Sequence, residues 1–273
     1  MMKTKYDVAV IGAGFGGLAA ALRTAHGGKK VALFEAQAGP GGKAGKIDIQ
    51  GIQCDTGPSV LTLPKIAMDL IELGGKGRSK DLKLIEPNPG FRYLYPDGVC
   101  LEIFSDIEQT FASVEKELGL KASSELRSFL NYSKRIWNAS APHFVYGSAP
   151  SWFNMIKLAL SHPLLIPKVD PLRSMNSSIK SRIKSQHLRM LLQRYATYNG
   201  SDPRNAPATL NCIAHVELAL GGFGIEGGMR ALVNLLEDIL IEFNVDLHYN
   251  TPISQILIGQ NQVKGLQTSS GQV

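Results

Sequence analysis

The chain has 273 residues, 44% hydrophobic and 19% charged, which suits one large domain or two and excludes a disordered or fibrous protein. Its net charge is +6, and residues 121–206 hold the whole excess, with 13 basic and three acidic residues. Cys54, Cys100 and Cys212 are odd in number and widely spaced, which argues against a disulfide framework or a cysteine zinc site and fits a reducing, cytoplasmic location. No metal site is predicted.

No stretch has the pattern of a secretory signal peptide or the run of about 18 apolar residues that a membrane-spanning helix needs. The first predicted element is a β-branched strand at residues 6–11, which runs into the G-x-G-x-x-G motif of residues 12–17. A helix follows at residues 18–26 and a second strand at residues 30–34. This strand-motif-helix order predicts a dinucleotide-binding turn.

Each residue type in this turn has a physical role. Gly12 permits the tight turn, Gly14 lets the backbone approach a pyrophosphate, and Gly17 lets the helix pack on the strand. Free N–H groups at the helix start attract phosphate. Glu35 ends the second strand, where its carboxylate binds ribose hydroxyls and repels a 2′-phosphate, which disfavours NADP. The motif alone does not choose between NAD and FAD.

Just beyond Glu35, Gly41-Gly42-Lys43 places a cation close to the expected phosphates, although a plain loop explains this spacing equally well.

Further elements are predicted from local patterns. A capping box at Ser105 and Glu108 begins a helix that ends at Leu118, and the stretch from Ser123 to Tyr198 is helical with breaks at its prolines. The remaining helices are expected at residues 64–73 and 228–243. Strands are expected at residues 83–85, 91–95, 99–104, 245–249, 253–258 and 263–268. Strands 91–95 and 99–104 are expected to form one hairpin, and strands 253–258 and 263–268 another.

The basic block also holds both tryptophans, Trp137 and Trp152. Within it, residues 151–161 form an amphipathic helix with a broad apolar face, followed by the apolar, basic-ended loop 162–168. Such a helix fits an anionic membrane interface, but a helix packed on the core has the same pattern. A nucleic-acid surface is disfavoured because no reader module accompanies the basic residues.

Taken together, several motifs resemble those of FAD-dependent carotenoid desaturases, of the phytoene desaturase and hydroxycarotenoid 3,4-desaturase type, within the amine-oxidase-like flavoproteins. The resemblance covers essentially the whole chain. It rests on residues 12–17, Glu35, residues 41–43, 55–59, 91–98, 194–210, 227–229 and 251–253.

The resemblance implies FAD as the cofactor. It places Gly14, Phe15, Gly16, Gly42 and Lys43 at the pyrophosphate and Glu35 at the ribose. Gly12 and Gly17 shape the turn. Lys43 stands where an arginine is common, which keeps the charge and loses the bidentate fork. The remaining implied contacts are Gly57, Pro58 and Ser59 with the flavin and the backbone of Ile253 with the adenine.

The resemblance also implies an α/β fold: a Rossmann-like FAD-binding domain, with a parallel sheet and a β-hairpin extension, plus an inserted substrate and membrane-binding region of strands and helices. Residues 1–80 and 207–273 would form the FAD-binding domain and residues 81–206 the inserted region. Because the family continues for about as long again, the chain is expected to be truncated, with Val273 entering a further strand.

The implied reaction is desaturation of an acyclic carotenoid, with hydride transfer to flavin N5 and loss of a proton, and with a quinone or oxygen as electron acceptor. Such a reaction needs positioning and a dry, apolar channel more than a particular side chain. No catalytic residue is predicted; His143, His162, His187 and His215 lie in the expected substrate region without a distinguishing pattern.

Three alternatives stay open: a flavin-dependent carotene isomerase, an amine oxidase on the same scaffold, and a non-catalytic fragment that binds FAD weakly. Because a carotenoid substrate dissolves in membranes, residues 121–206 are expected to bind an anionic membrane surface. The protein is therefore expected in the cytoplasm, bound peripherally to a membrane.

Overall fold

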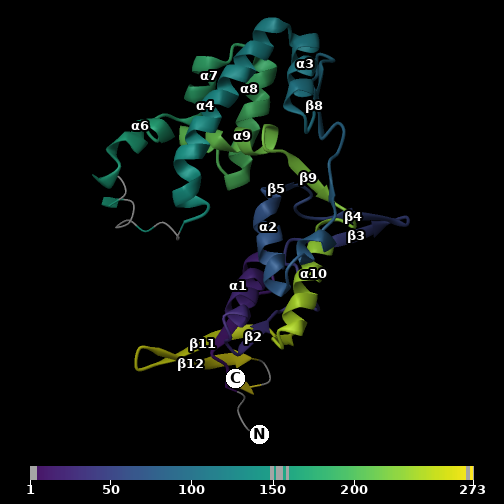
Figure 1. Ribbon diagram of the computed structural model, residues 1–273, viewed down its shortest axis with the longest axis vertical. Coiled ribbons are helices and arrows are strands. Elements are labelled where there is room, and N and C mark those ends of the chain that lie inside the picture. Colours follow the sequence, from purple (N-terminus) through teal and green to yellow (C-terminus); the bar gives the residue numbers. More distant parts are fainter. Residues whose placement is uncertain (1–4, 148–150, 152–155, 158–159, 269–270, 273) are drawn as a thin grey trace. The chain divides into compact units, whose positions relative to one another are not determined.

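The computed structural model describes residues 5–147, 151, 156–157, 160–268 and 271–272. The chain forms two compact units (Figure 1). The first combines Met1–Ile85 with Phe223–Val273, and the second is Glu86–Gly222. Two segments that are distant in sequence therefore build the first unit, with the second unit inserted between them. The functions assigned to residues 1–80, 81–206 and 207–273 remain predictions.

The first unit is built on a three-stranded parallel sheet. Its order is β1-β2-β10, formed by β1 (Val8–Ile11), β2 (Val31–Phe34) and β10 (Asp246–His248). All four residues of β2 are buried, as expected for the central strand of a sheet that is covered on both faces. The parallel sheet and its alternation with helices confirm the predicted Rossmann-like fold class.

Helix α1 (Phe15–His26) packs on this sheet, and α2 (Pro64–Ile71) and α10 (Met229–Glu242) pack against α1. α1 and α10 run side by side, and both contribute leucines to the same buried cluster (Figure 1). α1 begins at Phe15 rather than at the predicted Leu18, because the last glycines of the turn already have helical geometry. α2 ends at Ile71 and continues as the 3₁₀ turn η1 (Glu72–Gly74).

Antiparallel strands extend the first unit. The hairpin of β11 (Ile253–Gly259) and β12 (Gln262–Thr268) confirms the prediction. It turns through Gln260 and Asn261, which both have positive φ, the geometry of a two-residue hairpin turn. Most of the other strands were not predicted. β3 (Lys46–Ile49) pairs with β4 (Ile52–Asp55), and β13 (Gly271–Gln272) pairs with β12. A three-stranded sheet has the order β5 (Leu61–Thr62), β9 (Gly222–Ile225) and β6 (Leu84–Ile85).

The second unit combines one hairpin with a group of helices. As predicted, β7 (Phe91–Leu94) and β8 (Cys100–Ile103) are antiparallel partners. The helices are α3 (Ile107–Leu118), α4 (Leu120–Phe144), α6 (Ile166–Val169), α7 (Met175–Arg182), α8 (Gln186–Gln193) and α9 (Cys212–Leu218). The 3₁₀ turns of this unit are η3 (Pro163–Leu165), η4 (Arg194–Asn199) and η5 (Ala208–Asn211). A further 3₁₀ turn, η2 (Arg78–Asp81), belongs to the first unit.

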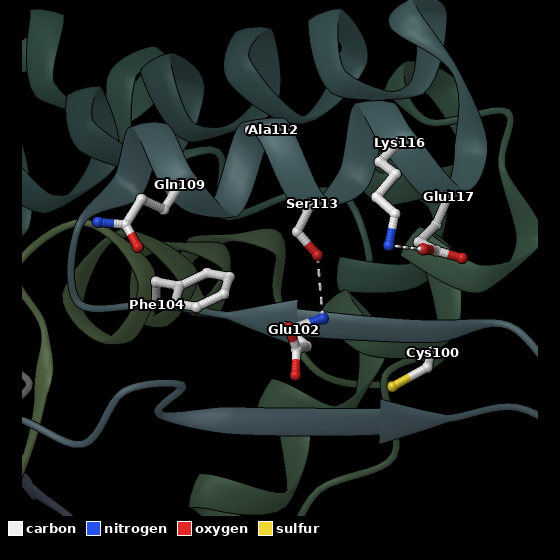
Figure 2. A pocket seen from close by; sticks show the side chains of 8 residues that line it. All are labelled: Cys100, Glu102, Phe104, Gln109, Ala112, Ser113, Lys116 and Glu117. Carbon is white, nitrogen blue, oxygen red and sulfur yellow. Dashed lines mark hydrogen bonds and ion pairs between the residues drawn. The ribbon is translucent and has the colours of Figure 1, made fainter.

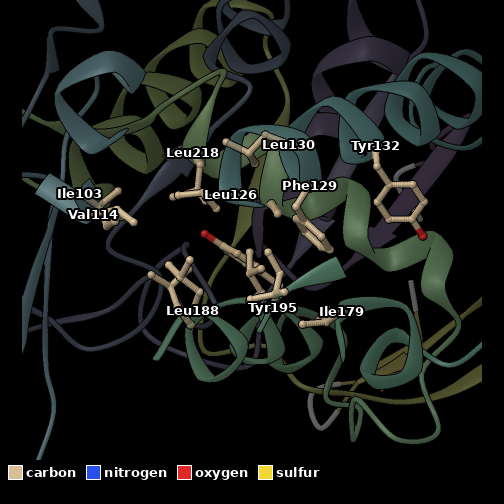
Figure 3. Packing of buried hydrophobic residues seen from close by; sticks show 14 of the residues in the cluster. Ile103, Val114, Leu126, Phe129, Leu130, Tyr132, Ile179, Leu188, Tyr195 and Leu218 are labelled. Carbon is tan, nitrogen blue, oxygen red and sulfur yellow. The ribbon is translucent and has the colours of Figure 1, made fainter. Parts of the chain in front are cut away.

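Figure 3 shows the core of the second unit. Phe129 and Leu126 of α4 are fully buried, and Leu188 of α8 and Tyr195 of η4 pack in the same cluster. Side chains from β8, α3, α4, α7, α8 and α9 all enter this cluster, so the hairpin and the helices share one core. No helix in the described parts of the chain is both long enough and apolar enough to span a bilayer.

The structure corrects three local predictions. The N-cap of α3 is Asp106, whose carboxylate accepts a hydrogen bond from the Glu108 N–H at 2.9 Å, so Ser105 does not form the predicted capping box. Pro142 lies inside the last turn of α4, where a missing N–H costs a single hydrogen bond, and therefore does not break the helix. Gly271 and Gln272 already form strand β13, whereas the further strand was expected to begin at Val273.

Candidate functional site

The turn between β1 and α1 is the centre of the candidate site. The Gly12 N–H donates to the Phe34 carbonyl at 2.7 Å, which joins the end of β1 to the end of β2. A Cβ on Gly17 would lie 1.8 Å from the Gly12 carbonyl oxygen, so only glycine allows α1 to approach the strand this closely. No side chain of the described residues caps α1, which leaves the N–H groups of its first turn for a ligand.

Glu35 lies directly beside this turn. It is only 8% exposed, and its carboxylate accepts hydrogen bonds from the Ala13 N–H at 2.7 Å and the Gln37 N–H at 2.9 Å. Each carboxylate oxygen accepts one of these bonds, so lone pairs remain for further donors such as hydroxyl groups. Glu35, which is predicted to bind the ribose, therefore also holds the turn in shape before any ligand binds.

The loop of residues 39–44 packs on the same turn. The Gly41 N–H donates to the Ala13 carbonyl at 2.8 Å, and a Cβ on Gly42 would lie 3.2 Å from the Gly14 Cα. Lys43 is exposed at the end of this loop. The structure therefore brings the chain at Lys43 close to the glycine turn.

Gly57 lies against this loop. A Cβ on Gly57 would lie 1.8 Å from the Lys43 carbonyl oxygen, so the close contact requires glycine. Pro58 and Ser59 follow directly and are exposed. The predicted flavin-facing segment and the predicted phosphate-facing loop thus touch within the first unit.

Ile253 is connected to the site through the backbone next to it. The Thr251 N–H donates to the Glu35 carbonyl at 2.8 Å, and Ile253 then begins β11 and packs with Phe34 and Leu266. All twelve predicted site residues consequently belong to the first unit. Backbone donors, a carboxylate and a cation are the groups that a dinucleotide needs, and no three His, Cys, Asp or Glu side chains in the described residues are arranged to hold a metal ion.

Two residues to which the sequence predictions gave no role also shape this site. Asp55 ends β4, and its carboxylate accepts a hydrogen bond from the Met229 N–H at 3.1 Å, which caps α10. Arg230 donates from its guanidinium to the Pro40 carbonyl. The glycine pair before α10 indicated a helix start, but no local pattern reveals a cap supplied from a strand 174 residues away.

Much of the predicted membrane region, residues 121–206, packs in the core of the second unit, whereas most described residues of the stretch 144–172 are exposed. Residues 148–150, 152–155 and 158–159, which include Trp152 and much of the predicted amphipathic helix, lie outside the described residues. Leu160 is 78% exposed and Leu172 is 91% exposed. The other exposed large apolar side chains of this stretch are Phe144, Val145, Tyr146, Ile156 and Ile166.

The four histidines of the predicted substrate region have different surroundings. His215 is buried in α9, and this burial lowers its pKa, with a smaller contribution from Lys134. His187 Nε2 lies 2.7 Å from the Asp97 carboxylate and its ring packs edge-on against Tyr95. The rings of His143 and His162 are 6.2 Å apart. None of these arrangements identifies a catalytic base.

The motif at residues 194–201 forms a buried polar cluster around Glu217. The Glu217 side chain, only 1% exposed, accepts hydrogen bonds from the Arg194 guanidinium and from the hydroxyls of Tyr195 and Tyr198. Arg194 also packs over the ring of Tyr93, at 5.5 Å. Burial raises the pKa of Tyr195 and of Tyr198, so both remain donors above the usual tyrosine range.

A surface cavity of about 500 Å³ lies between β8 and α3 of the second unit (Figure 2). Its lining includes an ion pair between Lys116 and Glu117 at 3.1 Å, and the Ser113 hydroxyl accepts a hydrogen bond from the Glu102 N–H. Phe104 and Ala112 are the main apolar groups. This polar cavity does not match the apolar channel that a carotenoid requires.

Comparison with known proteins gives consistent results. Residues 15–273 match the model of the family "Flavin containing amine oxidoreductase". The chain is 31% identical over 270 residues to hydroxyneurosporene desaturase of Rhodobacter capsulatus, covering 99% of this chain and 54% of the relative. It is 32% identical over 269 residues to 4,4′-diaponeurosporene oxygenase of Staphylococcus aureus, covering 98% and 54%.

Among solved structures, putrescine oxidase bound to putrescine aligns with a TM-score of 0.66 at 16% identity, over 98% of this chain and 56% of that chain. This likeness supports the fold alone. The chain spans about half the length of the curated relatives it matches.

Proposed function

Since this chain belongs to the flavin containing amine oxidoreductase family, we propose that it binds FAD and that its protein desaturates an acyclic carotenoid. The observation that carries the proposal is the match to two carotenoid enzymes over 98–99% of the chain at 31–32% identity. The glycine turn beside a buried carboxylate independently supports the FAD-binding part of the proposal.

The residues at the turn fit the phosphate and ribose parts of FAD. The uncapped N–H groups at residues 14–17 would receive the pyrophosphate, with Lys43 supplying a positive charge. The carboxylate of Glu35 keeps lone pairs for ribose hydroxyls while it holds Ala13 and Gln37. Gly57, Pro58 and Ser59 would face the flavin, and the backbone of Ile253 the adenine.

When bound, FAD would supply the oxidant, accepting at N5 the hydride that leaves one carbon of a CH–CH unit. The neighbouring carbon loses a proton, and the new double bond joins the polyene. The protein's part is to orient the substrate and exclude water. The proposed final electron acceptor is a quinone or oxygen.

The activity is tested by expressing the full-length protein together with enzymes that supply acyclic carotenoids. We expect each desaturation to lower the product mass by two hydrogen atoms and the purified protein to carry FAD. An unchanged mass with altered geometry would identify an isomerase, and added oxygen would match the oxygenase relative. Oxidation of an amine with every carotenoid unchanged would favour an amine oxidase, and FAD binding without any turnover would favour a non-catalytic role. Any of these outcomes contradicts desaturation.

We further propose that the segment of residues 144–172 meets an anionic membrane at the cytoplasmic face. Its exposed apolar side chains, among them Leu160 and Leu172, would enter the lipid. The exposed Lys157 and Lys168 would meet the head groups.

Replacing Lys157 and Lys168 together by alanine should weaken binding to phosphatidylserine vesicles roughly 30-fold, since each cation near an anionic surface contributes about 1 kcal/mol. Vesicle sedimentation at low and high salt measures the effect, and salt should weaken the unmodified protein likewise. The matched control replaces the exposed Lys76 and Lys80 of the first unit and should bind as before. Equal binding by both double variants would contradict the membrane proposal.

A further inference from the structure

Arg230 lies in the first turn of α10 and reaches the loop that carries Lys43. Its Nη1 donates to the Pro40 carbonyl, and its Nε donates to the Asn234 Oδ1 at 3.0 Å, one helical turn further on. The Asn234 contact holds the guanidinium in place, and the Pro40 contact joins α10 to a loop 190 residues earlier in the chain.

The guanidinium lies directly against the backbone of this loop. A Cβ on Gly39 would lie 3.7 Å from Arg230 Nη2, and a Cβ on Gly41 would lie 3.1 Å from Nη1. A Cβ on Gly41 would also lie 2.9 Å from the Ala44 carbonyl oxygen, so this position has no room for a side chain, whereas the Gly39 position is in ordinary van der Waals contact with the arginine. The flat guanidinium fits this surface in a way that the ammonium of lysine does not.

The same loop is bonded to the glycine turn. Gly41, the residue after Pro40, donates its N–H to the Ala13 carbonyl at 2.8 Å, and the Ala44 N–H closes the loop on the Gly41 carbonyl at 3.0 Å. A continuous path of contacts therefore runs from Arg230 through Pro40 and Gly41 to Ala13. Movement of the loop would displace both the turn and Lys43.

We propose that Arg230 is a positioning residue for the FAD site: it holds the loop of residues 39–44 against the glycine turn, so that the turn and Lys43 are set before the cofactor binds. Two of its nitrogens already donate to protein oxygens, which favours this role over direct contact with phosphate. The inference rests on the proposed flavin site, and a site that is preorganised in this way binds more tightly because less ordering is needed on binding.

The test compares the full chain with its Arg230→Gln and Arg230→Lys variants by two measurements. FAD titration of the apoprotein, followed by flavin fluorescence, should show affinity reduced about tenfold in Arg230→Gln, the loss expected for one charge-assisted hydrogen bond. Hydrogen exchange without FAD should show faster exchange of the Gly41 and Ala44 amides. Arg230→Lys should give a smaller change of the same sign in both measurements.

The control is Arg23→Gln, an exposed arginine on the last turn of α1, which should change neither measurement. Unchanged exchange at Gly41 and Ala44 in Arg230→Gln would overturn the positioning role, whatever happens to affinity, and so would faster exchange with unchanged affinity. If the unmodified chain fails to bind FAD, the proposed function fails, while the exchange measurement still decides whether Arg230 holds the loop.

Discussion

Replacing Gly17 with alanine should abolish FAD binding and lower the free energy of unfolding by about 3 kcal/mol, the upper part of the range for overpacking. The added methyl group would lie 1.8 Å from the Gly12 carbonyl oxygen. Neither atom belongs to a flexible side chain, so α1 has to move away from β1. That movement breaks up the donor groups at the start of α1. Urea denaturation and FAD titration measure the two effects.

Gly16→Ala is the matched control for stability, because nothing lies within 4 Å of a Cβ at Gly16. It lies in α1 beside Gly17 and should keep or slightly raise the stability, since alanine favours helix more than glycine does. Its Cβ points into open space near the proposed pyrophosphate, so its FAD affinity is a separate test of that placement. A Gly17→Ala protein as stable as Gly16→Ala would refute the packing argument.

Replacing Glu217 with glutamine should lower the free energy of unfolding by about 3 kcal/mol, the lower end for breaking a buried ion pair. The lower end applies because the Arg194 side chain is 34% exposed and keeps some contact with water. The glutamine removes the negative charge that faces the Arg194 guanidinium, whose Nε is buried with no hydrogen-bond partner among the described residues. Urea denaturation at neutral pH measures the loss.

The control for this variant is Glu108→Gln in the same unit. Glu108 also pairs with an arginine, Arg127, at 2.8 Å, but both side chains are at least half exposed. Solvent screens such a pair, so the denaturation midpoint should hardly change. Equal shifts for the two variants would show that burial of Glu217 does not matter.

Much of the first unit could be predicted from its sequence because the signals are local. The β-branched strand, the glycine turn and the acid at the end of β2 lie within residues 6–35 and identify a Rossmann-like start. The β11–β12 hairpin is likewise predicted from two neighbouring strand patterns, and in the structure Gln260 and Asn261 at its turn have positive φ.

The helix start at α3 shows where local patterns fail. Ser105 and Asp106 are both good N-cap residues, and each offers a plausible first turn. Asp106 is the cap because β8 and the Phe104 N–H bond to Thr110 fix where the chain leaves the strand. A shift of one residue is therefore decided by the preceding strand and its contacts, and not by the capping sequence itself.

By itself, the sequence determined the parallel-sheet fold class, the identity of the glycine turn and the presence of a carboxylate at the end of β2. These features depend on backbone geometry and on residues close together in the chain. Only the tertiary structure decided that Asp55 caps α10, that Arg230 holds the Pro40 loop and that Glu217 neutralises Arg194. The partners of Asp55 and Arg230 are 174 and 190 residues away, and those contacts exist only after the chain has packed, so no spacing rule reveals them.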